Sequence, residues 1–157
     1  ENLAIASGKG KSLGLQLGLT RKEREFFRER LALLDMGLEN RMKQKSKLLS
    51  GGQRQALTLF MAVISGPKLL LLDEHTAALD PGAAKKVLAL TDEFSKSSGL
   101  CTLMITHNMK AALGHGNRTI LMNDGQIVMD LFGEERKNMT VDRLVAQFEI
   151  ENDRMLL

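Results

Sequence analysis

Leu69-Leu70-Leu71-Leu72-Asp73-Glu74 is the stretch that decides the fold, because a short apolar run ends there in two carboxylates. It follows the turn signal Gly66-Pro67, and a continuous apolar run of this length is typical of a strand buried on both faces. In open α/β sheets ligands bind beyond the carboxyl ends of the strands. We therefore expect Asp73 to hold Mg²⁺ through water and Glu74 to orient and deprotonate an attacking water. The alternative is an exposed acidic loop, which the four leucines disfavour.

Ser50-Gly51-Gly52-Gln53 opens the helix that precedes this strand. Ser50 can cap the helix, and two glycines let a ligand approach the backbone without side-chain obstruction. The free N–H groups and the positive end of the helix dipole then face an anion. Ser-Gly-Gly alone is often only a flexible turn, but Gln-Arg-Gln and an apolar helix follow it here. The pattern predicts a phosphate-binding site.

The rest of the chain alternates between strands and helices from residue 67 onward, whereas residues 1–66 are predicted to be mostly helical. Thr20 and Glu23 form a capping box. Asp124-Gly125 is a two-residue hairpin signal. The other expected elements are strands at 68–73, 100–106, 118–123 and 126–131, and helices at 81–96, about 108–113 and from 141 onward.

Three further residues are candidates for roles. His107 follows the strand at 100–106, so it is expected at the same sheet edge as the carboxylates. A lone histidine is more often structural than catalytic. His75 lies beside the carboxylates and could tune them, but it has less support than His107. Cys101, the only cysteine, lies in an apolar run and is predicted to be a buried core thiol.

Composition bounds the class of protein. The 157 residues make about one domain, no apolar run approaches the ~18 residues of a membrane span, and no signal-peptide pattern is present. The missing initiator Met suggests a piece of a longer chain. Residues 7–47 carry eleven Lys or Arg against five Asp or Glu. This basic lobe could touch nucleic acid or acidic lipids, but without Trp or Tyr a solvated helical surface is the preferred interpretation.

Gly10-Lys11-Ser12 resembles the end of a phosphate-binding loop. The motif Gly-x-x-x-x-Gly-Lys-Ser/Thr requires an earlier glycine where Ile5 stands, and no strand-like run precedes it. We therefore predict a basic surface turn.

In order, these motifs resemble those of the ATP-binding subunit of a bacterial ABC transporter of the importer type. Leu49 to Gln53 matches the signature, Leu69 to Glu74 the Walker B strand, Ala78-Leu79-Asp80 the loop at the dimer interface, and His107 the switch histidine. The resemblance implies a partial α/β P-loop NTPase (ABC ATPase) fold. Residues 1–66 would be the helical signature subdomain. Residues 67–157 would be the C-terminal part of the RecA-like core, with a C-terminal hairpin and without the Walker A part.

The resemblance also implies a function. Two subunits would sandwich two ATP molecules with Mg²⁺. Ser50, Gly51, Gly52 and Gln53 would receive the γ-phosphate of the partner's ATP, with Asp80 at the interface, Asp73 serving the metal, and Glu74 and His107 acting in catalysis.

The implied partners are a second ATPase subunit, a membrane-spanning permease and an extracytoplasmic solute-binding protein, at the cytoplasmic face of the membrane. Uptake of a solute is expected, with an amino-acid type as the candidate, and nucleic acid is not expected as a partner. His75 and Ala77 stand where the family usually has Pro and Ser.

Two alternatives stay open. The basic lobe would suit a soluble ABC ATPase that works on nucleic acid or the ribosome. The absent Walker A part would suit a catalytically inactive fragment that only mediates interactions.

Overall fold

The structure is a computed structural model that describes residues 2–8 and 20–155, with side chains described up to residue 149. Gly10-Lys11-Ser12, for which a surface turn is predicted, lies outside the described residues. The chain divides into two compact units, Glu1–Leu103 and Met104–Leu157, and each is described by itself. The predicted functional division at residue 66 remains a prediction.

The first unit begins with helices. The described helices before the first strand are α1 (Asn2–Ser7), α2 (Arg21–Ala32), the 3-10 turns η1 (Leu38–Asn40) and η2 (Ser46–Leu48), and α3 (Gly51–Val63). The Thr20 side chain accepts the backbone N–H of Glu23, whose carboxylate accepts the backbone N–H of Thr20, so the predicted capping box is confirmed. The helix after Thr20 ends at Ala32.

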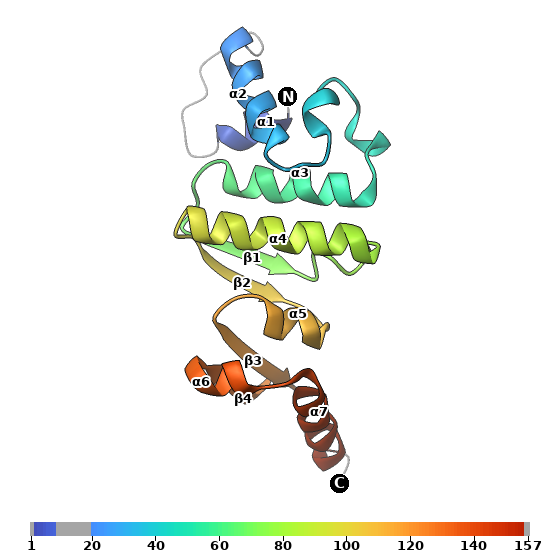
Figure 1. The fold of residues 1–157 in the computed structure, drawn as a ribbon, viewed down its shortest axis with the longest axis vertical. Helices are drawn as coiled ribbons and strands as arrows, with labels where there is room; N and C mark the ends of the chain where they lie inside the picture. Colours follow the sequence, from blue (N-terminus) through green and yellow to red (C-terminus); the bar gives the residue numbers. More distant parts are fainter. Residues whose placement is uncertain (1, 9–19, 156–157) are drawn as a thin grey trace. The chain divides into compact units, whose positions relative to one another are not determined.

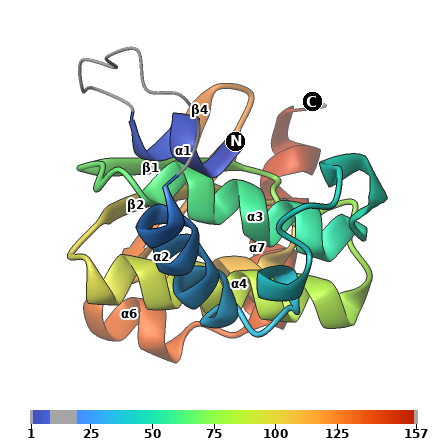
Figure 2. The same cartoon turned by 90° about the horizontal axis from the view of Figure 1, so that it is seen from above.

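A strand, a helix and a second strand follow. They are β1 (Leu69–Asp73), α4 (Pro81–Ser97) and β2 (Cys101–Ile105), and β1 and β2 form a two-stranded sheet. The two strands run in the same direction in Figure 1, as a connection through a helix requires. Figures 1 and 2 both show α3 beside α4, and Leu59 of α3 belongs to the same buried cluster as Leu70 of β1. The helical segment therefore packs directly onto the strand that carries the two carboxylates.

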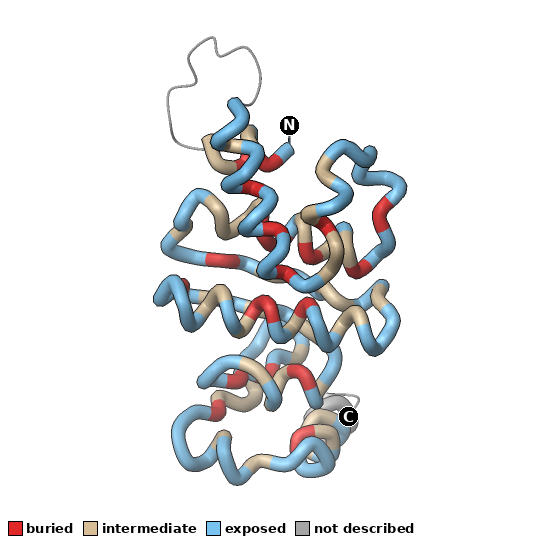
Figure 3. Tube along the Cα trace, turned by 45° about the horizontal axis from the view of Figure 1, so that its top comes forward, coloured by how far each residue is buried: buried red, intermediate tan, exposed pale blue. Residues whose placement is uncertain are grey.

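The core of the first unit lies between the helices and one face of β1. Leu31 of α2, Leu59 and Phe60 of α3, Leu70 of β1 and Val87 of α4 belong to one buried cluster. Figure 3 shows how short the buried stretches are, since they alternate with exposed and half-buried positions along each helix. Each helix therefore contributes one stripe to the core.

The prediction that the two central strands are buried on both faces is wrong for this chain. Leu69 and Leu71 are 52% and 64% exposed, and Leu103 of β2 is 53% exposed. Burial alternates along both strands because the helices cover only one face. Cys101 points to the uncovered face and is exposed, so the prediction of a buried thiol is also wrong.

The second unit has its own core. Its elements are α5 (Met109–Gly114), the antiparallel hairpin β3 (Arg118–Asn123) and β4 (Gln126–Phe132), α6 (Gly133–Asn138) and α7 (Val141–Met155). Leu121, Leu131 and Leu144 are its buried centre. Asp124 and Gly125 both have positive φ, 47° and 75°, as a two-residue hairpin turn demands, so the predicted hairpin is confirmed. In the described part of the chain no helix combines the length and apolar character needed to cross a membrane.

Candidate nucleotide site

Two side chains of the predicted phosphate site are engaged in capping α3. The Ser50 Oγ accepts the Gln53 backbone N–H at 3.2 Å, and the Gln53 Oε1 accepts the Ser50 backbone N–H at 3.1 Å. Gln53 Nε2 also donates to the carbonyl of Met36 at 3.0 Å, which fixes its amide. The Ser50 hydroxyl hydrogen is not needed for this cap, because the oxygen acts there as an acceptor. Ser50 can therefore cap the helix and still donate to an anion.

Gly51 and Gly52 differ in what surrounds them. Gly51 is exposed, whereas Gly52 is buried. A Cβ on Gly52 would lie 2.7 Å from the Cβ of Ala83 in α4, far inside the contact distance, while a Cβ on Gly51 would lie 3.3 Å from Leu79 Cδ2. Gly52 thus lets α3 and α4 pack closely, a role that local sequence patterns did not reveal.

Asp80 is brought next to the signature residues by this packing. It is the N-cap of α4, and its Oδ1 accepts the Ala83 backbone N–H at 3.0 Å. Since Ala83 packs against Gly52, the first turns of α3 and α4 lie side by side. Two capped helix N-termini with positive dipole ends therefore meet within the first unit.

Glu74 occupies a strained position directly after β1. Its φ of 42° is in the left-handed region, which is uncommon for a residue with a side chain. Its carbonyl accepts the N–H of Ala77 at 3.0 Å, which closes a tight turn. Asp73 is the last residue of β1 and Glu74 follows it, so the predicted position at the end of the strand is confirmed, and both residues are exposed. Strain of this kind is frequent at functional sites.

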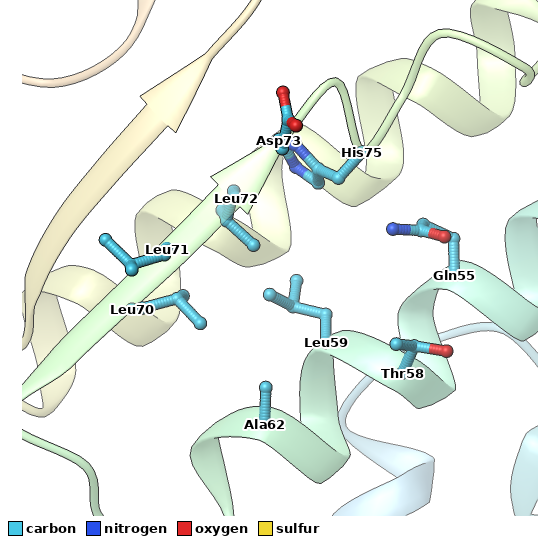
Figure 4. A pocket seen from close by; sticks show the side chains of 9 residues that line it. All are labelled: Gln55, Thr58, Leu59, Ala62, Leu70, Leu71, Leu72, Asp73 and His75. Carbon is cyan, nitrogen blue, oxygen red and sulfur yellow. The ribbon is translucent and has the colours of Figure 1, made fainter.

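Asp73 and His75 line an open groove of about 230 Å³ between α3 and β1. Figure 4 shows the side chains of Leu59 and Gln55 pointing from α3 toward the strand, with His75 beyond its end. The described residues contain no group of three or more His, Cys, Asp or Glu that could enclose a metal ion. One exposed carboxylate does fit Mg²⁺ that keeps most of its waters and binds phosphate oxygens.

His75 makes a contact that sequence reasoning missed. Its Nε2 lies 3.2 Å from the Oγ1 of Thr91, a buried residue sixteen positions later in α4. The only signal in the sequence was that His75 adjoins the carboxylates. No local pattern pairs residues so far apart.

His107 lies in the second unit, between β2 and α5, and is exposed. The adjacent Asn108 caps α5 by accepting the Ala111 N–H at 3.1 Å. Ser50 to Gln53, Asp73, Glu74 and Asp80 all lie in the first unit. The meeting of His107 with the carboxylates therefore stays a prediction.

Several known proteins are similar to this chain in sequence. The sequence model of the family described as "ABC transporter" matches residues 16–77. The tyrosine transport ATP-binding protein of Clostridioides difficile is 42% identical over 149 residues, which are 95% of this chain and 59% of that protein. The methionine import ATP-binding protein MetN of Streptococcus mutans is 36% identical over 121 residues, 74% of this chain and 34% of that protein. The chain spans less than two thirds of either relative.

Solved structures share the fold. An ABC transporter in an inward-facing conformation has a TM-score of 0.72 at 28% identity, covering 94% of this chain and 56% of that chain. An ATP-binding cassette solved as a dimer with ADP and phosphate has a TM-score of 0.60 at 26% identity, covering 83% of this chain and 56% of that chain.

Proposed function

Because this chain belongs to the ABC transporter family of ATP-binding proteins, we propose that it is part of an ATPase subunit that energises solute uptake. The observation that carries the proposal is the 42% identity to a tyrosine transport ATP-binding protein, which extends over 95% of this chain. Family members bind nucleotide, as the cassette with ADP and phosphate illustrates. The matches to transport proteins favour this function over work on nucleic acid or the ribosome.

In the proposed reaction the carboxylate of Glu74 accepts a proton from the attacking water and aligns the water with the γ-phosphate. The strained turn supports this role, because it sets the carboxylate at the end of a strand. Asp73 would hold Mg²⁺ through water, and the ion when bound would neutralise charge on the phosphate oxygens. His107 would donate a hydrogen bond to the γ-phosphate.

Ser50, Gly51, Gly52 and Gln53 would act on the ATP of a second subunit. The first N–H groups of a helix lack intrahelical acceptors, so those of Gly51 and Gly52 suit phosphate oxygens. Asp80 would lie at the same interface, since α3 and α4 begin side by side. The dimeric cassette among the similar structures supports pairing of two subunits.

The proposed partners follow from the relatives. A permease would span the membrane, an extracytoplasmic protein would deliver the solute, and the ATPase would lie at the cytoplasmic face. The first relative transports tyrosine and the second imports methionine, which supports an amino acid as the solute.

The test uses the protein expressed from its whole gene and compares the Glu74→Gln variant with the wild type. Mg²⁺-dependent ATP hydrolysis should fall by at least about a hundredfold, since the base is removed, while ATP binding is kept. Glu93→Gln, an exposed residue of α4, is the matched control and should hydrolyse ATP normally. Full activity of Glu74→Gln would contradict the assignment of the base.

A further inference from the structure

A side-chain hydrogen bond between His75 and Thr91 ties the turn that carries Glu74 to the interior of α4. We propose that His75 is a positioning residue, whose bond to Thr91 holds the Glu74 backbone in the conformation from which its carboxylate acts on water. The inference rests on the proposed function, because it assigns to His75 a role in that same reaction.

The Glu74 backbone needs an outside restraint. A left-handed φ costs a residue with a Cβ about 1 kcal/mol or more, so the chain relaxes unless its surroundings hold it. Two backbone bonds close the turn, Ala77 N–H to Glu74 O at 3.0 Å and Leu79 N–H to Thr76 O at 3.2 Å. Both lie within the turn itself. They shape it but do not attach it to the rest of the unit.

The direction of the His75–Thr91 bond follows from counting hydrogens. The Thr91 Oγ1 donates its only hydrogen to the carbonyl of Val87 at 2.9 Å. Toward the ring it can therefore act only as an acceptor, so His75 Nε2 carries a hydrogen and donates it at 3.2 Å. The bond fixes the tautomer of His75 as well as the ring's position.

The acceptor is itself rigidly held. Thr91 is 5% exposed and lies in the middle of α4, against the fully buried Val87. Its carbonyl accepts the Ser95 hydroxyl at 2.8 Å, and Ser95 Oγ lies 2.8 Å from Thr102 Oγ1. His75, the residue after Glu74, is thus bonded to a buried and hydrogen-bonded position of α4. Breaking the His75–Thr91 bond should therefore let the Glu74 carboxylate change position without removing it.

Two substitutions break the bond from opposite ends. Thr91→Val keeps the shape of the side chain and deletes the acceptor, and His75→Phe keeps a ring and deletes the donor. Thr91→Ser restores the hydroxyl and is the rescue variant. Ser95→Ala is the matched control, because it removes a hydroxyl one turn further along α4 and leaves His75–Thr91 intact.

The experiment measures steady-state ATP hydrolysis by the gene-encoded protein, together with imidazole ¹H–¹⁵N spectra at about pH 8. We expect Thr91→Val and His75→Phe each to lower kcat by about tenfold with an unchanged KM for ATP, because a small misplacement of a reacting group suffices. Thr91→Ser and Ser95→Ala should keep the wild-type kcat. The His75 spectrum should show the Nε2–H tautomer and change in Thr91→Val but not in Ser95→Ala.

The possible outcomes distinguish a failure of the role of His75 from a failure of the proposed ATPase function. Hydrolysis that Glu74→Gln abolishes but Thr91→Val preserves would overturn the role of His75 alone. A kcat that Thr91→Ser fails to restore, or an Nδ1–H tautomer of His75, would overturn it too. If the wild type does not hydrolyse ATP, the proposed function falls together with the inference. If Ser95→Ala lowers kcat as much as Thr91→Val does, the effect comes from a general disturbance of α4, and the inference is also wrong.

Discussion

At the residue scale, there are two reasons why position 52 could require glycine. A phosphate could approach the backbone closely there, or α4 could pack closely against it. The second is visible in the structure, because a Cβ at Gly52 would lie 2.7 Å from the Cβ of Ala83. Gly52→Ala should therefore lower the free energy of unfolding by about 1–3 kcal/mol even without nucleotide. Gly51→Ala should be nearly neutral, since its nearest contact is the movable end of Leu79 at 3.3 Å. Urea unfolding of both variants measures the difference.

A compensating change distinguishes packing from other causes. Ala83→Gly deletes the atom that Gly52→Ala would strike, so the double variant should recover part of the lost stability beyond additivity. Purely additive effects of the two substitutions would contradict the packing explanation. The signature glycine would then be required for ligand binding alone.

At the scale of an element, Ser50 caps the N-terminus of α3, and we propose that it also binds phosphate. Ser50→Ala removes the acceptor for the Gln53 N–H and should cost about 1 kcal/mol of stability. Ser50→Asp keeps a capping acceptor, so stability should be retained, yet its negative charge should repel a phosphate and weaken ATP-driven dimerisation. Thermal unfolding and dimerisation with ATP, measured on both variants, separate the two roles. Unimpaired dimerisation of Ser50→Asp would speak against a phosphate at this helix.

The β3–β4 hairpin carries a titratable pair across its two strands. Arg118 Nε donates to Asp130 Oδ1 at 2.8 Å, and this bond lowers the pKa of the Asp130 carboxyl below its ordinary value of 3.8. A carboxyl whose pKa is lower in the folded than in the unfolded state stabilises the fold at pH values above its unfolded-state pKa. This stabilisation is lost as the pH falls through the folded-state pKa. The wild type should thus melt above Asp130→Asn near neutral pH, and the difference should shrink as the pH falls below 3.8 and vanish only below the lowered folded-state pKa of Asp130. A difference that persists in acid would exclude the carboxylate as its source.

Local chemistry made several elements predictable from the sequence. Side-chain caps at Thr20 and Ser50 and the Asp124-Gly125 turn depend on neighbours within three residues, and the structure contains all of them. The His75–Thr91 bond and the packing of Gly52 were not predictable, because each joins residues far apart in the chain. The short helix α6 was missed because it carries no long apolar pattern, whereas α1 lies in the stretch 1–66 that was predicted to be mostly helical.

At the scale of the whole molecule, the expected α/β fold of a P-loop ABC ATPase is confirmed by the similar solved structures. The burial of β1 was overestimated for a physical reason. An apolar run shows that a strand could be buried on both faces. Whether it is buried depends on the elements that pack against it, and in this chain Leu71 of β1 is 64% exposed. The placement of catalytic residues around one nucleotide depends on such partners too, so it stays a prediction.

Two separate apolar clusters predict two separately opening units. Leu144 is 1% exposed in the cluster of the second unit, and Leu59 is 2% exposed in that of the first. Leu144→Ala should cost about 2–5 kcal/mol and raise amide hydrogen exchange in β3, β4 and α7, while α3 stays protected. Leu59→Ala is the matched control, with the reverse pattern expected. Exchange that rises equally in both units for either variant would mean that the chain opens as one cooperative body.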